Sequence, residues 1–91
     1  MNKRISSTNE FLKTIADTNR LKILVFLKSF PKCVCEIFPM LKVSQKLASH
    51  HFSQLKKLNL VRQERNGNFI YYSVNKKALK KYLTALNSII K

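Results

Sequence analysis

The stretch QKLASHHFSQLKKLNL (residues 45–60), continued by VRQERNGNFIYYSV (residues 61–74), decides the fold. In the first part apolar side chains recur at the helical period, and Ser44 stands before it as a favourable N-cap, so we predict a helix. The second part is rich in β-branched and aromatic residues on both sides of Asn66-Gly67, which is the strongest short signal for a β-hairpin. We therefore expect a helix that is followed directly by a two-stranded ribbon.

Further helices are predicted on both sides of this unit. Residues 9–30 contain two helical patterns, with Asp17 as the candidate N-cap of the second. A short helix is expected within residues 33–41, and Asn75 is a candidate cap for a last helix. This order predicts a winged helix-turn-helix, a mainly α fold with a β-hairpin wing. Because the sequence has no repeats, low-complexity tracts or linkers, residues 1–91 are expected to form a single domain.

The charge of the chain indicates an anionic partner. Lysine and arginine number 18 against 4 aspartate and glutamate residues, which gives a formal net charge of +14. Such an imbalance is typical of proteins that bind nucleic acid or an acidic membrane surface. A membrane-surface peptide would need a basic amphipathic helix without a hairpin. We therefore expect double-stranded DNA as the partner, and no membrane.

Other classes of protein are disfavoured by what the sequence lacks. No apolar run approaches the roughly 20 residues that span a bilayer, and the polar segment MNKRISSTNE does not have the pattern of a signal peptide. We therefore expect a cytoplasmic protein. With four acidic residues, no glycine-rich phosphate loop and no Cys–His pair close in sequence, we do not expect an enzyme.

The predicted helix over residues 44–58 has two different faces when it is drawn at about 100° per residue. The apolar face includes His51, which we expect to be a hydrogen-bonded core histidine. The polar face is suited to base edges and phosphates, and carries Gln45, Lys46, Ser49, His50, Ser53 and Lys57. The hairpin adds Arg62 and Arg65, which can follow a minor groove or the adjacent phosphates. The alternative is that these side chains are only solvated.

Both cysteines of the chain, Cys33 and Cys35, lie in KCVCEIFPML (residues 32–41). In a cytoplasmic protein a close pair of reduced thiols indicates metal or redox chemistry more than a structural disulfide. Two thiolates suit a soft ion of low coordination number, such as As(III) or Sb(III) with water or hydroxide as a third ligand, and Hg(II) and Cu(I) stay open. A redox or reactive-sulfur switch and a pair without any sensing role are the alternatives. No obligatory cofactor is expected.

The spacing of the thiols suggests how a ligand would act. On an intact helix, residues two apart point about 200° away from each other, so one ion could bridge Cys33 and Cys35 only if the first turn unwinds. Pro39 lacks the N–H that would bond the carbonyl of Cys35, which weakens that turn. The alternative is that Pro39 only shapes the following turn.

Four segments together resemble the ArsR/SmtB family of metal-responsive winged-helix repressors. They are LKTIADTNRLKILVFL, CVCEI, LASHHFSQLKKLNLV and RNGNFIYYSV, and the resemblance runs from about Phe11 to Val74. CVCEI is the specific part, because it resembles the thiolate motif of the arsenic and cadmium/lead sensors. The sequence departs from the family where arsenic sensors often carry a third cysteine, since Phe38 stands there. It also lacks the N-terminal cysteines of the cadmium/lead sensors and the Asp, His and Glu ligands of the zinc sensors on the last helix.

The resemblance implies a repressor that leaves its operator when an ion binds. It gives the DNA-contact role to Gln45, Lys46, Ser49 and His50, and the ligand role to Cys33 and Cys35. It also implies a homodimer built from the first and last helices. We expect the dimer surface to comprise Phe11, Leu12, Ile15, Tyr82, Leu83, Leu86 and Ile90.

Overall fold

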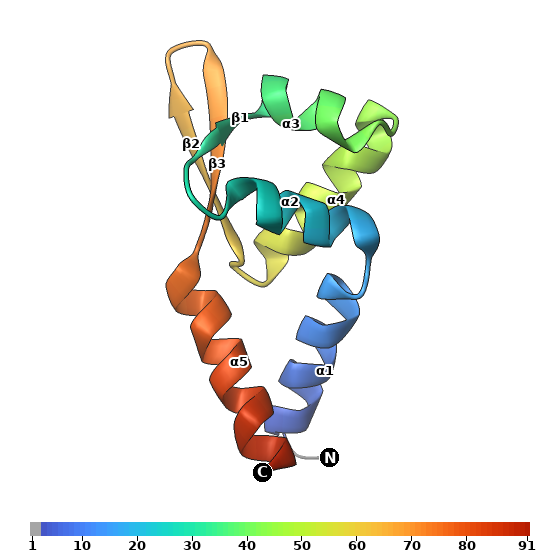
Figure 1. The fold of residues 1–91 in the computed structure, drawn as a ribbon, viewed down its shortest axis with the longest axis vertical. Coiled ribbons are helices and arrows are strands. Elements are labelled where there is room, and N and C mark those ends of the chain that lie inside the picture. The colour runs from blue at the N-terminus through green and yellow to red at the C-terminus, as the bar shows by residue number, and fades with distance from the viewer. Residues whose placement is uncertain (1–2) are drawn as a thin grey trace.

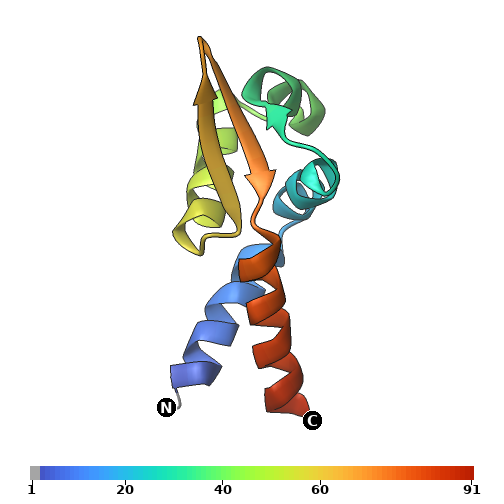
Figure 2. The same ribbon diagram turned by 90° about the vertical axis from the view of Figure 1, so that its left-hand side faces the viewer.

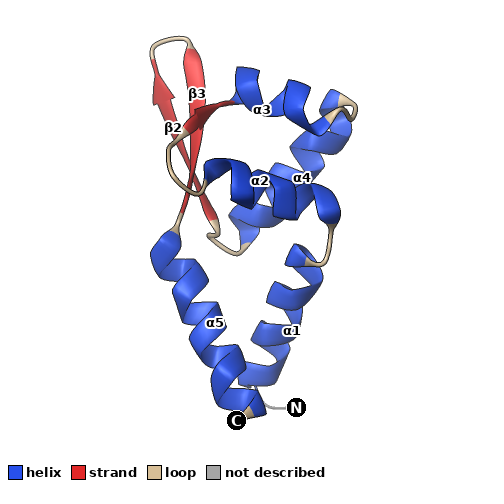
Figure 3. Ribbon diagram, viewed as in Figure 1, coloured by secondary structure: helices blue, strands red, loops and turns tan. Residues whose placement is uncertain are grey.

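A computed structural model describes residues 3–91 (Figure 1). Its elements in chain order are α1 (Lys3–Ile15), α2 (Thr18–Leu27), β1 (Lys32–Cys33), α3 (Val34–Leu41), α4 (Gln45–Lys57), β2 (Val61–Asn66), β3 (Phe69–Val74) and α5 (Lys76–Ile90). Helices dominate, and the strands form one small antiparallel sheet (Figure 3). The expected winged helix-turn-helix is confirmed. No helix within residues 3–91 is long and apolar enough to cross a membrane.

Three side-chain caps set the helix starts that the sequence predicts. The carboxylate of Asp17 accepts hydrogen bonds from the backbone N–H groups of Asn19 and Arg20. The Ser44 hydroxyl accepts from the third residue of α4, and the Asn75 side chain accepts from the third residue of α5. Each cap satisfies N–H groups that have no partner inside the helix, which fixes where α2, α4 and α5 begin.

The hairpin differs from the prediction by one residue. Asn66 is paired with Phe69, so Gly67 and Asn68 form the turn instead of Asn66 and Gly67. Gly67 has φ +64°, and Asn68 is not among the residues with positive φ. A positive φ at the first central position alone is the type II′ pattern, which favours glycine there.

The sheet also contains a third strand that was not predicted. β1 pairs antiparallel with β3, with Lys32 opposite Tyr72 and Cys33 opposite Tyr71, so the strand order is β1-β3-β2. β1 has only two residues, too few to show an alternating pattern in the sequence. The segment that carries the first cysteine is therefore part of the wing's own sheet.

The core lies between α2, α3, α4 and the inner face of the hairpin. Its buried apolar residues are Phe11, Ile23, Leu27, Ile37, Leu41, Ala48, Phe52, Leu55, Leu60, Val61 and Tyr72. Tyr72 stacks on Phe52 with the ring centroids 4.4 Å apart. This stack fixes the wing against the apolar face of α4.

α1 and α5 extend together away from this core, and the start of α1 and the end of α5 lie at the far end of the molecule (Figure 2). Phe11 is fully buried and stacks on Tyr82 of the same chain, with ring centroids 4.8 Å apart. The prediction that Phe11 lies on a dimer surface is therefore wrong, because its ring is covered within the chain. Leu12, Leu83 and Ile90 of the predicted dimer surface are exposed, whereas Ile15, Tyr82 and Leu86 are half-buried.

Phe11→Ala should lower the free energy of unfolding by about 3–5 kcal/mol, because it removes a buried ring and its stack on Tyr82. Urea unfolding at one fixed protein concentration measures this loss. The matched control is Val25→Ala on the outer face of α2, where the side chain is 64% exposed, and the change should stay within about 0.5 kcal/mol. Similar losses in the two variants would contradict the place of Phe11 in the core.

Candidate nucleic-acid interface and thiol site

α4 separates its side chains as the sequence predicts. Ala48, His51, Phe52 and Leu55 are buried. The six polar residues proposed for DNA contact are all exposed, namely Gln45, Lys46, Ser49, His50, Ser53 and Lys57. One face of α4 is therefore fixed in the core, and the other is available to a partner.

A groove of about 300 Å³ lies where α3, α4 and the wing meet. Its walls include Gln45, Ser49 and Lys56 of α4 and Tyr72 of β3. Because side chains alternate along a strand, Arg65 lies on the same face of β2 as Gln63, which bonds Lys56 of α4. Arg62 is exposed on the opposite face. The structure therefore brings Arg65, but not Arg62, to the side of the wing that faces α4.

Lys56 lines this groove, although the sequence analysis did not single it out. Its Nζ donates to Gln63 Oε1 over 3.1 Å and lies 6.0 Å from the centre of the Tyr72 ring. The Tyr72 hydroxyl donates to the same Gln63 oxygen over 3.2 Å. Burial raises the pKa of Tyr72, so its phenol stays a neutral donor. The helical period could have identified Lys56 from the sequence, because it follows Ser53 by three residues on the polar face of α4.

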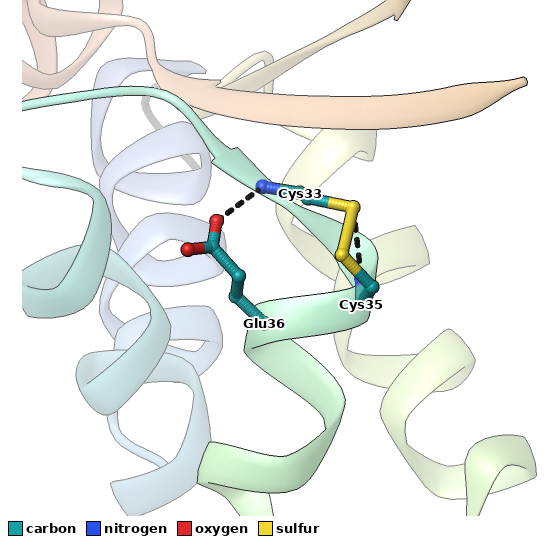
Figure 4. Close-up of a disulfide and its surroundings, with 3 residues drawn as sticks. All are labelled: Cys33, Cys35 and Glu36. Atoms are coloured by element: carbon teal, nitrogen blue, oxygen red, sulfur yellow. Dashed lines mark hydrogen bonds between the residues drawn. A yellow bond between two sulfur atoms is a disulfide. The ribbon is translucent and has the colours of Figure 1, made fainter.

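Cys33 is the N-cap of α3 and directly precedes its first helical residue. Its backbone is extended (φ −67°, ψ 144°), and its Sγ accepts a hydrogen bond from the backbone N–H of Cys35 over 3.2 Å. Glu36 Oε2 accepts from the N–H of Cys33 over 3.0 Å (Figure 4). These two bonds form a capping box, with a cysteine sulfur in the place usually taken by a serine or threonine oxygen.

The two sulfur atoms of Cys33 and Cys35 are joined in a disulfide (Figure 4). The expectation of reduced thiols is therefore not met in this structure. The expectation that the two side chains point apart is wrong, because Cys33 is an extended N-cap and its sulfur turns back over Cys35. No unwinding of α3 is needed to bring the sulfurs together, so the role suggested for Pro39 in such unwinding loses its basis.

The donor atoms near the thiols are few. Cys33 is 5% exposed, whereas Cys35 is exposed. Within residues 3–91 no group of three or more His, Cys, Asp or Glu side chains is placed to hold a metal ion, and the Glu36 carboxylate already caps α3. Once reduced, the pair offers two sulfur ligands. This set is incomplete for tetrahedral zinc, and it fits a thiophilic ion that takes few protein ligands.

Known proteins share both the sequence pattern and the fold. Residues 17–63 match the family model described as "Bacterial regulatory protein, arsR family". The chain is 36% identical over 69 residues to the cadmium resistance transcriptional regulatory protein CadC of Listeria innocua, a match that covers 75% of this chain and 58% of that protein. The chain thus spans less than two thirds of that regulator's length.

Two further relatives are covered more completely. The chain is 33% identical over 78 residues to the arsenical resistance operon repressor of Staphylococcus aureus, which covers 86% of this chain and 75% of that repressor. The crystal structure of NolR from Sinorhizobium fredii superposes with a TM-score of 0.76 at 33% identity, over 93% of this chain and 85% of that one.

The capping role of Cys33 predicts a difference between two substitutions in the reduced protein. Cys33→Ser should keep the start of α3, because a hydroxyl caps a helix well, whereas Cys33→Ala should be less stable than Cys33→Ser by about 0.5–2 kcal/mol. Urea unfolding in the presence of a reductant measures both. The same pair of substitutions at Cys35 is the control and should differ less, since its sulfur caps no helix. Equal stability of the two Cys33 variants would contradict the capping role.

Proposed function

Because the chain belongs to the arsR family of bacterial regulatory proteins, we propose that it is a cytoplasmic, dimeric repressor that binds operator DNA. In this proposal the reduced thiols of Cys33 and Cys35 bind a thiophilic ion, As(III) or Sb(III) in the first place, and the repressor then leaves the DNA. The observation that carries the proposal is the position of Cys33, which is at once a strand residue of the wing's sheet and the N-cap of the helix before α4.

The DNA-binding part rests on α4 and the wing. The exposed face of α4 starts with short polar side chains at the N-terminal end, where the backbone can approach the floor of a major groove. Gln45 and Ser49 are suited to base edges, and Lys46 and His50 to guanine or phosphate. Arg65 lies on the side of β2 that faces α4, and its side chain can reach the DNA backbone beside the major groove. The chain's net charge of +14 supplies the sequence-independent attraction.

The dimer rests on the exposed apolar residues of α1 and α5. Ile5 and Leu12 of α1 and Leu86, Ile89 and Ile90 of α5 line a hollow of about 300 Å³ between these helices. Leu83 and Ile90 are 50% and 73% exposed in the single chain. A second copy of the chain would cover this apolar surface, and its α4 would read a second half-site of a palindromic operator.

The coupling between the thiols and α4 follows a short path of contacts. Cys33 pairs with Tyr71 across the β1–β3 ladder, and the neighbouring Tyr72 stacks on Phe52 of α4. An ion on Cys33 Sγ competes with the hydrogen bond that this atom accepts from the N–H of Cys35. The peptide between the two cysteines must then adjust at the point where β1 meets β3. A shift there changes the angle between α4 and the wing. Binding of the dimer to both half-sites of the operator requires this angle to be fixed.

A second candidate signal is favoured by the bond between the two sulfurs. A low-molecular-weight disulfide can oxidise the pair by thiol–disulfide exchange: the Cys33–Cys35 bond forms, the added disulfide is cleaved, and two small thiols carry away the protons and electrons. In this alternative the bonded form is the state without affinity for DNA, and reduction restores the repressor.

The DNA-binding part predicts a steep dependence of affinity on salt, measured by fluorescence anisotropy with a duplex that the protein itself selects from a random library. Arg65→Ala should reduce the slope of log Kd against log salt by about 1, because one phosphate contact is lost. Arg62→Ala removes the same charge from the outer face of β2 and is the matched control with a smaller change. An affinity of the wild-type protein that does not respond to salt would refute DNA binding of this kind.

The thiol part predicts that arsenite lowers the DNA affinity of the reduced protein by roughly 5–150-fold, the range of a coupling energy of about 1–3 kcal/mol. Cys33→Ser and Cys35→Ser should each abolish the response and still bind DNA without arsenite. Release by oxidised glutathione but not by arsenite would favour the redox alternative. Full release of the Cys33→Ser/Cys35→Ser double variant by both agents would refute both forms of sensing.

A further inference from the structure

Three helices meet at a polar contact that lies outside the thiol site. Arg20 of α2 donates from Nε to the carbonyl oxygen of Thr14 in α1 over 2.5 Å, and from a terminal nitrogen to Nδ1 of His51 in α4 over 3.1 Å. Asp17, the N-cap of α2, places a carboxylate oxygen 3.9 Å from the same Nδ1. The end of α1, the start of α2 and the middle of α4 are thus held together through one guanidinium group.

The contact defines the protonation state of His51. A guanidinium nitrogen can only donate, so Nδ1 must accept and the ring proton lies on Nε2. His51 is 4% exposed, and within residues 3–91 its buried Nε2 has no hydrogen-bond partner. Burial lowers the pKa of His51 below its ordinary value of 6.5; the Asp17 carboxylate opposes this, and the charges of Arg20 and His50 add to it. The histidine in this contact is therefore neutral.

We propose that neutral His51 is a positioning residue that holds α4 in its DNA-reading orientation through Arg20, and that protonation of His51 weakens DNA binding independently of the thiols. This inference rests on the proposed DNA-binding function. It adds a second input, acidification, in the middle of α4's buried face, where α4 contacts Arg20 of α2.

Protonation would remove the contact in two ways. Nδ1 would carry a proton and could no longer accept from Arg20, and two cations would then face each other across 3.1 Å. The titratable and charged groups that face His51 are Asp17 and Arg20 of α2 and His50 of α4, while α1 contributes the neutral Thr14 carbonyl behind Arg20. Asp17 compensates only in part, because its oxygen already accepts from the N–H groups of Asn19 and Arg20.

The direction of the pH effect follows from linkage. The native contact favours the neutral ring, so its contribution is complete above the ordinary histidine pKa and is lost as the pH falls below it. The exposed His50 lies on the outer face of α4, which is proposed to contact DNA, so its side chain has to be removed from the comparison. A variant with His50→Gln therefore separates the two histidines.

The test is the DNA affinity of His50→Gln between about pH 7.5 and pH 5.5, at constant salt and with reduced thiols. We expect the affinity to fall by about tenfold, the change that corresponds to one pKa unit of difference between free and bound protein. Adding His51→Gln should make the affinity independent of pH in this range, because an amide oxygen still accepts from Arg20 and does not titrate. This double variant should bind DNA better than His50→Gln/His51→Leu at every pH, because leucine cannot accept the bond. A flat profile of His50→Gln, or an unchanged slope after His51→Gln, would overturn the inference.

A second measurement does not depend on the folding of any variant. If protonation of His51 weakens DNA binding, DNA must lower the pKa of His51 by the same coupling. The ring protons of His51 in the wild-type protein, followed by NMR with and without duplex DNA, should titrate at lower pH in the complex. Equal pKa values of His51 in the free and the DNA-bound protein would overturn this inference alone. A wild-type protein without DNA affinity at about pH 7.5 would refute both the proposed function and this inference.

Discussion

Tyr72 stacks on Phe52 with ring centroids 4.4 Å apart, and this contact joins the wing to α4. The backbone of the same tyrosine pairs with Lys32 of β1, and its hydroxyl donates to Gln63 of β2, so one residue links the three strands of the sheet to α4. Together with the bond from Lys56 to Gln63, this stack sets the position of the exposed face of α4 relative to the basic edge of the hairpin. DNA recognition by a helix and a wing needs that relation, because both must reach one duplex at once.

Cys33 lies one residue pair along the ladder from this stack. It is the N-cap of α3 as well as a strand residue, so its sulfur is bonded to a helix start while its backbone belongs to the sheet. The polar contact of Arg20 with His51 holds α4 against α2. α4 is thus held by the wing, whose sheet contains Cys33, and by Arg20 of α2 through the imidazole of His51.

Local chemistry explains what the sequence predicts. Capping side chains, the glycine at the hairpin and the helical period of α4 act within a few residues, so the element order and the two faces of α4 follow from the sequence. Three features that depend on contacts between distant segments were missed or misplaced. The short strand β1 forms only through its pairing with β3, and the same sheet holds the backbone of Cys33 extended. Phe11 is buried because Tyr82 covers its ring from another helix.

The most direct test of this account is the pattern of backbone amide shifts when arsenite is added to the reduced protein without DNA. The account predicts shifts at Cys33 and Cys35, at Tyr72 across the β-ladder, and at Phe52 and its neighbours on α4, all absent in the double serine variant. Shifts that stay within residues 32–37 would show that the thiols bind without reaching α4, and would contradict the proposed coupling.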